Sequence, residues 1–361
     1  MFGLFKRTVK FILAICFYYS GSLVLLSVFK RIQADKNNFT ILMYHRILDE
    51  EDIERDHIQA GIIVSRKVFE KQMAYISKKY NLLSLKELTE ILKKNQSPPS
   101  KSIVITFDDG WRDNYQNAYP IMKKYNIPAA IFLATDFIDS DNLFWFEEIG
   151  MILAKRKITS DKLWEIIEKA RKERKSASPP QSSDSPKSGA DSIDADRFIE
   201  ELKQFDHDVI LSIIGELRKE SGISSEKIKG DRQTLSWDEV LEMSENGIDF
   251  GSHGCSHRIL PGLERDEVKR ELIESKRILE EKTGKTISLF SYPNGDFNEE
   301  IKKLVREAGY NCAVSTGAYK IDQEAPDLYA LKRIGIHDGA TAGPTGRYFR
   351  ALFAFHITRN M

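Results

Sequence analysis

Hydrophobic and polar positions along the chain follow two patterns that alternate. Short runs of apolar, often β-branched residues predict buried strands at 40–44, 103–106, 129–134, 248–251, 287–291 and 312–315. Longer stretches, with apolar residues every three or four positions, predict helices at 66–79, 85–94, 115–125, 237–246, 265–283 and 299–308. Strands that alternate with helices favour parallel β/α units, so we expect an α/β fold.

The first part of the chain has a different pattern, because residues 9–29 are almost uninterrupted apolar sequence. That length suits one membrane-spanning helix. A secretory signal peptide is the alternative, but no small-x-small cleavage site follows the run. We therefore expect residues 1–38 to form an uncleaved membrane anchor and a juxtamembrane segment. Basic residues flank the run on both sides, so its orientation is not fixed by charge.

The alternation also breaks between residues 150 and 232. Helices are predicted at 161–175 and 197–219, with a Ser-, Pro- and Asp-rich stretch between them that is typical of a disordered loop. We expect a helical insertion at 150–232 within one domain that spans 39–345, and a C-terminal tail at 346–361.

Charge and cysteine content narrow the functional classes. Lys and Arg total 54, as do Asp and Glu, so no basic field favours binding to nucleic acid. The chain has three cysteines, too few to indicate a disulfide framework.

Two acids follow the predicted strand at 103–106. Asp108 and Asp109 are adjacent, and Gly110 permits a sharp turn after them. Adjacent carboxylates repel each other, and burial of either one costs free energy unless a cation or a proton compensates. The segment is a candidate metal and general-base site, with an ordinary Asp-Asp-Gly turn as the alternative.

Two histidines follow the strand at 248–251. His253 and His257 are four residues apart, a spacing that on a helical turn places both imidazoles on one side. Two His and one carboxylate, with open positions left over, are typical of a catalytic divalent-metal site. A third segment, 288–295, runs from an apolar strand into a turn whose N–H groups are suited to hold an oxyanion, although an ordinary strand-turn-helix joint has the same pattern.

Together these segments resemble the polysaccharide deacetylase family, also called the NodB-homology or carbohydrate esterase 4 group. The matching motifs are Thr-Phe-Asp-Asp-Gly at 106–110, His-x-x-x-His at 253–257 and Phe-Ser-Tyr-Pro-Asn-Gly at 290–295. The resemblance covers residues 39–150 and 232–340. It implies a distorted, incomplete (β/α) barrel, in agreement with the strand-helix alternation.

The resemblance also implies roles for the motif residues. Asp109, His253 and His257 are expected to bind one divalent metal, with zinc as the first expectation and cobalt, nickel, manganese or iron as alternatives. Asp108 is expected to be the base that takes a proton from a metal-bound water, which attacks the acetyl carbonyl. The metal and a backbone N–H, that of Asn294, are expected to stabilise the oxyanion.

The amine that leaves needs a proton, and two histidines are candidates for the acid. His45 ends an early apolar strand, as in the poly-N-acetylglucosamine deacetylase branch of the family, and we favour it. His337 is similar to the family's late histidine motif and is the alternate acid.

The sequence departs from the family in two places. Ser291 stands where many members carry an Arg that orients the catalytic Asp, and no Asp-Trp motif occurs near 312–316.

Tyr292 is a further candidate for substrate or oxyanion contact. Trp145 is a candidate for stacking on a sugar ring, although core packing is the commoner role of such aromatic residues.

We therefore expect a single-pass membrane protein with an extracytoplasmic catalytic domain. Its activity would be metal-dependent hydrolysis of N-acetyl groups on the amino sugars of a polysaccharide, so an N-acetylated glycan is the expected substrate and other polysaccharide-assembly proteins are further candidate partners. One alternative is a metal-dependent amidase of the same fold acting on a small non-sugar amide. The other is a catalytically silent glycan-binding or assembly protein.

Overall fold

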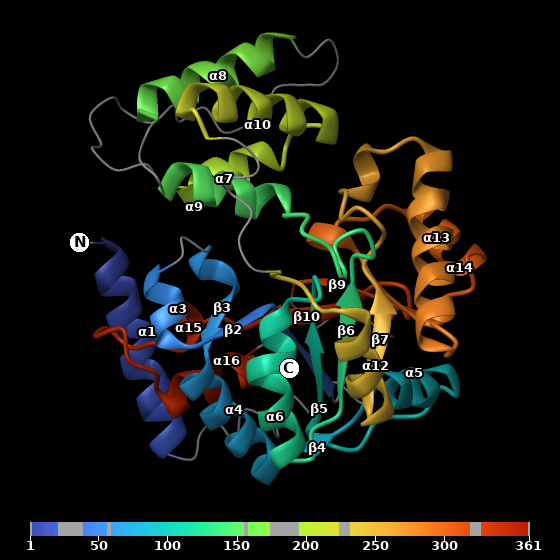
Figure 1. Cartoon of the computed structure of the whole chain (residues 1–361). Coiled ribbons are helices and arrows are strands. Elements are labelled where there is room, and N and C mark those ends of the chain that lie inside the picture. The colour runs from blue at the N-terminus through green and yellow to red at the C-terminus, as the bar shows by residue number, and fades with distance from the viewer. Residues whose placement is uncertain are drawn as a thin grey trace. The chain divides into compact units, whose positions relative to one another are not determined.

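A computed structural model describes residues 2–20, 39–55, 59–154, 158–173, 195–223, 232–317 and 326–359. The chain divides into two compact units (Figure 1). The first unit consists of residues 1–52, 60–140 and 232–361, and the second of residues 53–59 and 141–231.

The first unit is built on a parallel β-barrel. Within the described ranges, seven strands form a closed ring in the order β1-β10-β9-β8-β7-β6-β5, because β5 pairs with β1 as well as with β6. These strands are β1 (Phe39–Tyr44), β5 (Ser102–Phe107), β6 (Ala129–Leu133), β7 (Ile248–Ser252), β8 (Leu289–Ser291), β9 (Cys312–Thr316) and β10 (Leu331–Gly335). The short strand β4 (Asn81–Leu82) pairs with the first residues of β5, and β2 (Arg46–Leu48) pairs with β3 (Ile63–Ser65) in a separate sheet.

The predicted α/β class and parallel barrel are confirmed, but the ring is closed rather than incomplete. Closure comes from a continuous register between β1 and β5, from Phe39 opposite Ser102 to Tyr44 opposite Phe107. This pairing joins strands that lie far apart in the sequence, and the apolar pattern of each strand carries no information about its neighbours.

Both faces of the strands are buried, which explains their uninterrupted apolar runs. Along β5, Ile103 and Ile105 belong to the large core that also contains residues of the surrounding helices. Val104 points the other way, into a second core with Phe132 of β6 and Leu289 of β8. The barrel is therefore filled with side chains, and chemistry is left to the loops at the ends of its strands.

Helices surround the barrel close to their predicted positions. The larger ones are α4 (Arg66–Lys79), α5 (Leu85–Lys93), α12 (Trp237–Glu245), α13 (Arg265–Thr283), α14 (Glu299–Glu307) and α16 (Arg350–Arg359). Shorter elements are α3 (Glu50–Arg55), η1 (Ala60–Ile62), η2 (Asn114–Ala118), α6 (Tyr119–Lys124), η3 (Leu260–Gly262), η4 (Pro293–Gly295) and α15 (Asp338–Thr341). Ser84 and Ser236 begin α5 and α12 with capping boxes, which satisfy backbone N–H groups that a helix leaves unpaired.

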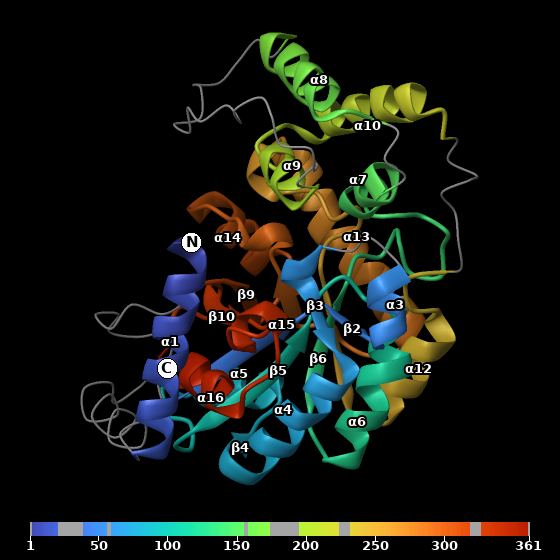
Figure 2. The ribbon, with the colours of Figure 1, turned by 90° about the vertical axis from the view of Figure 1, so that its left-hand side faces the viewer.

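The first helix, α1 (Phe2–Tyr19), lies beside α16 in both ribbon views (Figures 1 and 2). The rings of Phe11 and Phe349 meet edge to face with centroids 4.7 Å apart. The second half of the predicted membrane span, residues 21–29, lies outside the described residues. Among the helices that the structure does describe, none is both long and apolar enough to cross a bilayer. The segment predicted as a C-terminal tail contains α16.

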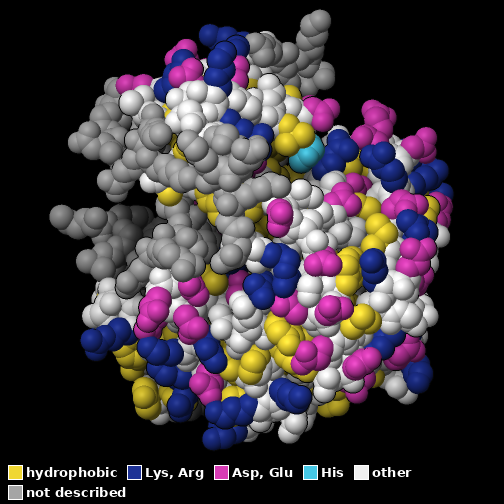
Figure 3. All heavy atoms as spheres, in the orientation of Figure 1, with side chains coloured by type: hydrophobic (Ala, Val, Ile, Leu, Met, Phe, Trp, Pro, Cys, Tyr) yellow, Lys and Arg dark blue, Asp and Glu magenta, His cyan; other side chains and the backbone are white. Residues whose placement is uncertain are grey.

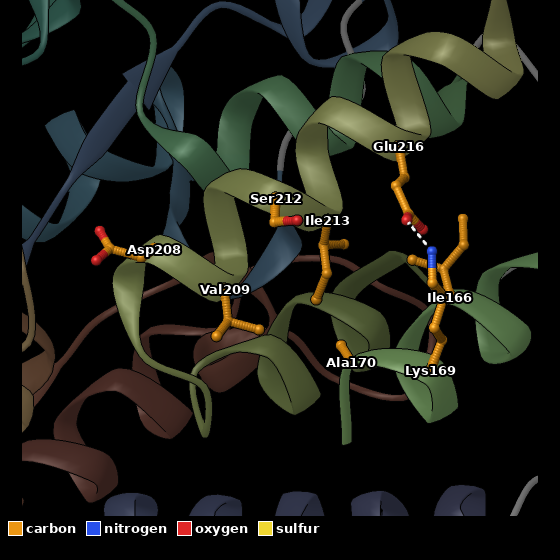
Figure 4. A pocket seen from close by; sticks show the side chains of 8 residues that line it. All are labelled: Ile166, Lys169, Ala170, Asp208, Val209, Ser212, Ile213 and Glu216. Carbon is orange, nitrogen blue, oxygen red and sulfur yellow. Dashed lines mark hydrogen bonds and ion pairs between the residues drawn. The ribbon is translucent and has the colours of Figure 1, made fainter. Parts of the chain in front are cut away.

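The second unit contains the helices α7 (Trp145–Ala154), α8 (Ser160–Glu173), α9 (Ala195–Leu202) and α10 (His207–Ser221). Glu148 of α7 is buried and accepts hydrogen bonds from the guanidinium of Arg218 of α10. A pocket between α8 and α10 has an apolar lining that includes Ile166 and Ile213, with the Lys169–Glu216 ion pair beside it (Figure 4). The predicted insertion is thus helical where it is described, while its Ser- and Pro-rich stretch falls outside the described residues.

On the surface, Lys and Arg side chains are interspersed with Asp and Glu side chains over the face shown in Figure 3. This mixture agrees with the equal numbers of acidic and basic residues in the sequence.

Candidate metal centre

Three side chains from the ends of two strands converge beside the barrel. Asp109 follows β5, and His253 and His257 follow β7. Oδ1 of Asp109 lies 3.5 Å from Nε2 of His253 and 3.2 Å from Nε2 of His257. Asp109 and His253 are buried, and one ligand atom from each of the three residues lies within 4.8 Å of the others. The structure thus brings together the three residues that the sequence predicts as metal ligands.

The loops that carry these groups have an unusual backbone. Asp109, His257 and Asn294 each have a positive φ, at 74°, 56° and 59°. Such conformations are disfavoured for residues other than glycine and persist where the surrounding structure imposes them, often at functional sites. Gly110 follows at φ 77°, and a Cβ added there would come within 2.6 Å of Leu133 Cδ2. The positive φ of Gly110 favours glycine at this turn, and a side chain there would press against Leu133.

The hydrogen bonds of His253 fix which nitrogen faces the site. Its Nδ1 lies 2.7 Å from the carbonyl oxygen of Ser291, which can only accept, so Nδ1 carries the proton. The lone pair of Nε2 is thereby directed towards Asp109. Burial lowers the pKa of His253 to about 4, so the ring is neutral near pH 7, as a metal ligand must be.

The donor set fits a divalent cation. Oδ1 of Asp109 is buried and has no hydrogen-bond partner among the described residues. His257 Nε2 is close to it and forms an ion pair with it when protonated. Burial alone would raise the pKa of Asp109, whereas His257 and the other nearby imidazoles hold it well below its usual range. The ionised Oδ1 of Asp109 faces Nε2 of both imidazoles, and Nε2 of His253 presents a lone pair. A divalent cation bound between these atoms would complete the arrangement.

Asp108 is held by a residue that the sequence analysis did not identify. Arg333 of β10 donates from Nη1 to Oδ1 at 2.7 Å and from Nη2 to Oδ2 at 2.6 Å. Burial alone would raise the pKa of Asp108, but the Arg333 guanidinium, aided by His253, brings it below its ordinary value. Nη2 also donates to Ser291 Oγ at 2.9 Å. An arginine that lies on another strand, outside the third motif, thus holds Asp108 and contacts Ser291 of that motif.

The two candidate acids follow adjacent strands, β1 and β10. His45 follows β1, and the Asp108 N–H donates to the carbonyl oxygen of Tyr44 at 3.1 Å. A charge on His45 acts on both Asp108 and Asp109, lowering their pKa values. His337 lies two residues beyond β10, and its own pKa is lowered by burial and by the charge of Lys10.

The remaining predicted residues lie in different surroundings. Tyr292 is fully buried; its hydroxyl donates to the Tyr329 carbonyl and its backbone N–H to that of Val314, so neither donor is left for a substrate. Asn294 is exposed, and its side-chain amide donates to Asp296 at 2.6 Å. Trp145 belongs to the second unit, where its ring packs edge to face on Phe146.

Two further buried side chains contact the motif loops. Trp111, directly after the Asp-Asp-Gly turn, donates from its indole nitrogen to Asp109. Glu271 of α13 accepts hydrogen bonds from the loop between His253 and His257. Trp111 could be suspected from the sequence as an aromatic residue beside a motif, whereas Glu271 is one of many acidic residues on a charged helix and carries no such signal.

Comparisons with known proteins point to one family. Residues 95–175 and 191–313 match the family model described as polysaccharide deacetylase. The chain is 25% identical over 315 residues to the Bacillus subtilis (strain 168) protein named "Putative polysaccharide deacetylase YxkH", covering 86% of this chain and 76% of that protein. It is 32% identical over 147 residues to the poly-beta-1,6-N-acetyl-D-glucosamine N-deacetylase of Staphylococcus aureus (strain MSSA476), which is 38% of this chain and 49% of that protein.

Solved structures share the fold. The Streptococcus pyogenes deacetylase PplD in complex with acetate superposes with a TM-score of 0.52 at 20% identity, covering 85% of this chain and 95% of that one. IcaB from Ammonifex degensii superposes with a TM-score of 0.51 at 15% identity, covering 84% and 93%. Since the family model matches more than half of the sequence, the chain belongs to the polysaccharide deacetylase family of hydrolases.

Proposed function

We propose that this protein is a metal-dependent hydrolase that removes N-acetyl groups from the amino sugars of a polysaccharide. The observation that carries the proposal is the convergence of Asp109, His253 and His257 beside the Asp108–Arg333 ion pair. The named activity of the Staphylococcus aureus relative supports an N-acetylated glycan as the substrate class.

The metal ligands would be Asp109, His253 and His257. One carboxylate and two imidazoles suit zinc, and cobalt, nickel, manganese and iron accept the same donor types. A divalent ion bound there would polarise the acetyl carbonyl and lower the pKa of water.

Asp108 would be the proton acceptor. The bidentate pair with Arg333 keeps its carboxylate ionised and fixes its orientation, so it is ready to take a proton near neutral pH. Its Oδ2 lies 3.9 Å from His253 Nε2 and is therefore the oxygen beside the metal ligands. We therefore assign Oδ2 of Asp108 as the oxygen that accepts the proton.

His45 would return a proton to the amine that leaves, and the backbone N–H of Asn294 would donate to the developing oxyanion. The charge interaction of His45 with Asp108 and Asp109 supports its place near the reacting atoms. The Arg333–Asp108 pair also weakens the alternative of a catalytically silent protein, because an arginine orients Asp108 although the third motif lacks one.

Two variants test the proposal by different readouts. Asp108→Asn should keep its bound metal and lose about 10²–10⁴-fold in turnover, the range typical of a lost general base. His253→Ala should lose the metal itself. Metal content and acetate release from N-acetylglucosamine oligomers would be measured for both, with Asp266→Asn, an exposed acid on α13, as the control. Wild-type turnover in Asp108→Asn, or unchanged metal content in His253→Ala, would overturn the corresponding role.

We also propose that residues 9–29 attach the protein to a membrane, with the catalytic domain on the extracytoplasmic side. The support is the apolar run in the sequence together with the glycan substrate class. Carbonate extraction of the full chain and protease accessibility of the domain in intact cells test this. Extraction of the protein without detergent would contradict it.

A further inference from the structure

The two carboxylate oxygens of Asp109 have different surroundings. Oδ2 accepts a hydrogen bond of 2.9 Å from the indole N–H of Trp111, whose side chain is 1% exposed. Oδ1 is the oxygen that faces His253 and His257. The indole N–H engages Oδ2, and Oδ1 faces the two imidazoles, so a cation shared with them would bind Oδ1 in the observed orientation.

Trp111 is itself held in place by a buried cation. The guanidinium carbon of Arg46 lies over the indole ring, 4.2 Å from its centroid, in a cation–π contact. Arg46 donates from Nε to Asp113 Oδ2 at 2.7 Å and from Nη2 to Gln233 Oε1 at 3.3 Å. Arg46 is 4% exposed and Asp113 5%, so this pair is largely shielded from solvent.

The same cluster reaches the backbone of the proposed acid. Asp113 Oδ1 accepts a 2.7 Å hydrogen bond from the Ile47 N–H, two residues after His45. Asn114 donates from its side-chain amide to the His45 carbonyl at 2.7 Å and to Asp113 Oδ1 at 3.1 Å. One buried network therefore joins the loop of Asp109 to the strand end that carries His45.

We propose that Trp111 is a positioning residue that restricts Asp109 to a single metal-binding oxygen, and that Arg46 and Asp113 hold the indole in that position. The inference rests on the metal site of the proposed function. Two imidazole nitrogens and one carboxylate oxygen leave coordination positions open for water and for the acetyl oxygen. A carboxylate that bound through both oxygens would occupy one of these positions.

Trp111→Phe tests this, because it keeps an aromatic ring for Arg46 and removes the N–H. The protein, freed of metal, would be titrated with Co²⁺, whose visible absorption reports coordination number and whose affinity is measured by competition with a chelator. We expect a weaker absorption per bound ion, as coordination number rises, and an affinity lower by about 10-fold. Trp237→Phe is the control, since that indole lies on α12 with Lys282 over its ring.

Arg46→Lys provides a second variant, which keeps a cation for Asp113 and loses the guanidinium contact with Trp111. We expect the absorption per bound Co²⁺ to weaken as in Trp111→Phe, but by a smaller amount. A wild-type spectrum and affinity in both variants would overturn the role of Trp111. Failure of the wild-type protein to bind Co²⁺ would instead overturn the metal site, and with it the proposed function, so the two failures are distinguishable.

Discussion

Arg333 and Asp108 form a two-point ion pair between strands that are not neighbours. Arg333 lies on β10 and Asp108 follows β5, and in the ring these two strands flank β1 on either side. Arg333 is fully buried and Asp108 is 3% exposed. The pair therefore spans β1 inside the barrel, at the point where the ring closes, and it fixes the orientation of the proposed base.

Arg333→Ala should destabilise the protein by about 3–5 kcal/mol, because removal of one partner leaves the other charge buried without compensation. The folded-state pKa of Asp108 is now below its ordinary value, so its contribution to stability is present above the unfolded pKa and lost as pH falls through the folded one. Without Arg333, burial would raise that pKa. The acidic limb of the kcat/KM profile should therefore move to higher pH.

Urea unfolding and the pH–rate profile check this prediction. The matched control is Arg277→Ala on α13, which removes an exposed arginine paired with Glu274 and Glu281. Exposed pairs contribute little to stability. Equal unfolding midpoints for the two variants, or an acidic limb that stays in place in Arg333→Ala, would be inconsistent with the buried pair.

The metal-free protein should lose stability as the pH falls from about 6.5 to about 4, on account of His253. Burial lowers the pKa of this residue to about 4 in the folded state. Within that window the unfolded chain binds a proton that the folded chain does not, so the free energy of unfolding decreases with falling pH. Asp108 and Asp109 act at lower pH, because both have pKa values below their ordinary range.

Urea unfolding in the presence of a chelator, at several pH values, measures this effect. His253→Gln should flatten the pH dependence between about 4 and 6.5 relative to the wild type. The pH dependence of His337→Gln is measured for comparison, because burial and the charge of Lys10 also lower the pKa of His337. If His253→Gln left the slope unchanged, the neutral, buried form of His253 would be refuted.

Glu271→Ala should weaken metal binding although Glu271 is not a proposed ligand. Its carboxylate, 4% exposed, accepts hydrogen bonds from the N–H groups of Cys255 and Ser256 and from the Ser256 hydroxyl, at 2.6, 3.0 and 2.6 Å. These bonds hold the loop between His253 and His257. Loss of such outer support costs about 10- to 100-fold in metal affinity.

The affinity would be measured by competition with a chelator, and the rise in Tm on adding Zn²⁺ gives an independent readout. Glu274→Ala is the control, since Glu274 lies on the same helix and pairs with Arg277 at the surface. Equal affinities for the two variants would show that the loop keeps its shape without Glu271.

The sequence predicts the residues of the site better than it predicts the residues that hold them in place. Asp108, Asp109, His253 and His257 lie in short local motifs directly after apolar strands, and parallel strands bring such ends together whatever their order. Arg333 lies 225 residues from Asp108. Its proximity depends on the pairing of β1 with both β5 and β10, which no local pattern specifies.

The direction in which a side chain points is the other feature that the sequence does not predict. Tyr292 lies in a matching motif, and the motif does not reveal that its ring turns into the core, stacked on Phe297. Trp111 and Glu271 act through hydrogen bonds that depend on the loop conformations of Asp109 and His257, both with positive φ. Such conformations are imposed by the folded surroundings and are not encoded by residue type.

His45→Ala should slow turnover more than His337→Ala. Both residues follow strands beside each other in the ring, but the charge of His45 acts on Asp108 and Asp109, whereas the charge of Lys10 opposes protonation of His337. An acid must hold a proton in order to give it to the amine that leaves. We expect a loss of about 10²–10⁴-fold in kcat for His45→Ala and a much smaller loss for His337→Ala.

A change of leaving group separates an acid from a merely structural residue. With an aryl acetate, the departing phenolate is stable without a proton, so His45→Ala should recover most of its activity relative to the wild type. A structural defect would impair amide and ester substrates alike. The acid role would pass to His337 if its variant, rather than that of His45, lost activity on the amide and regained it on the ester.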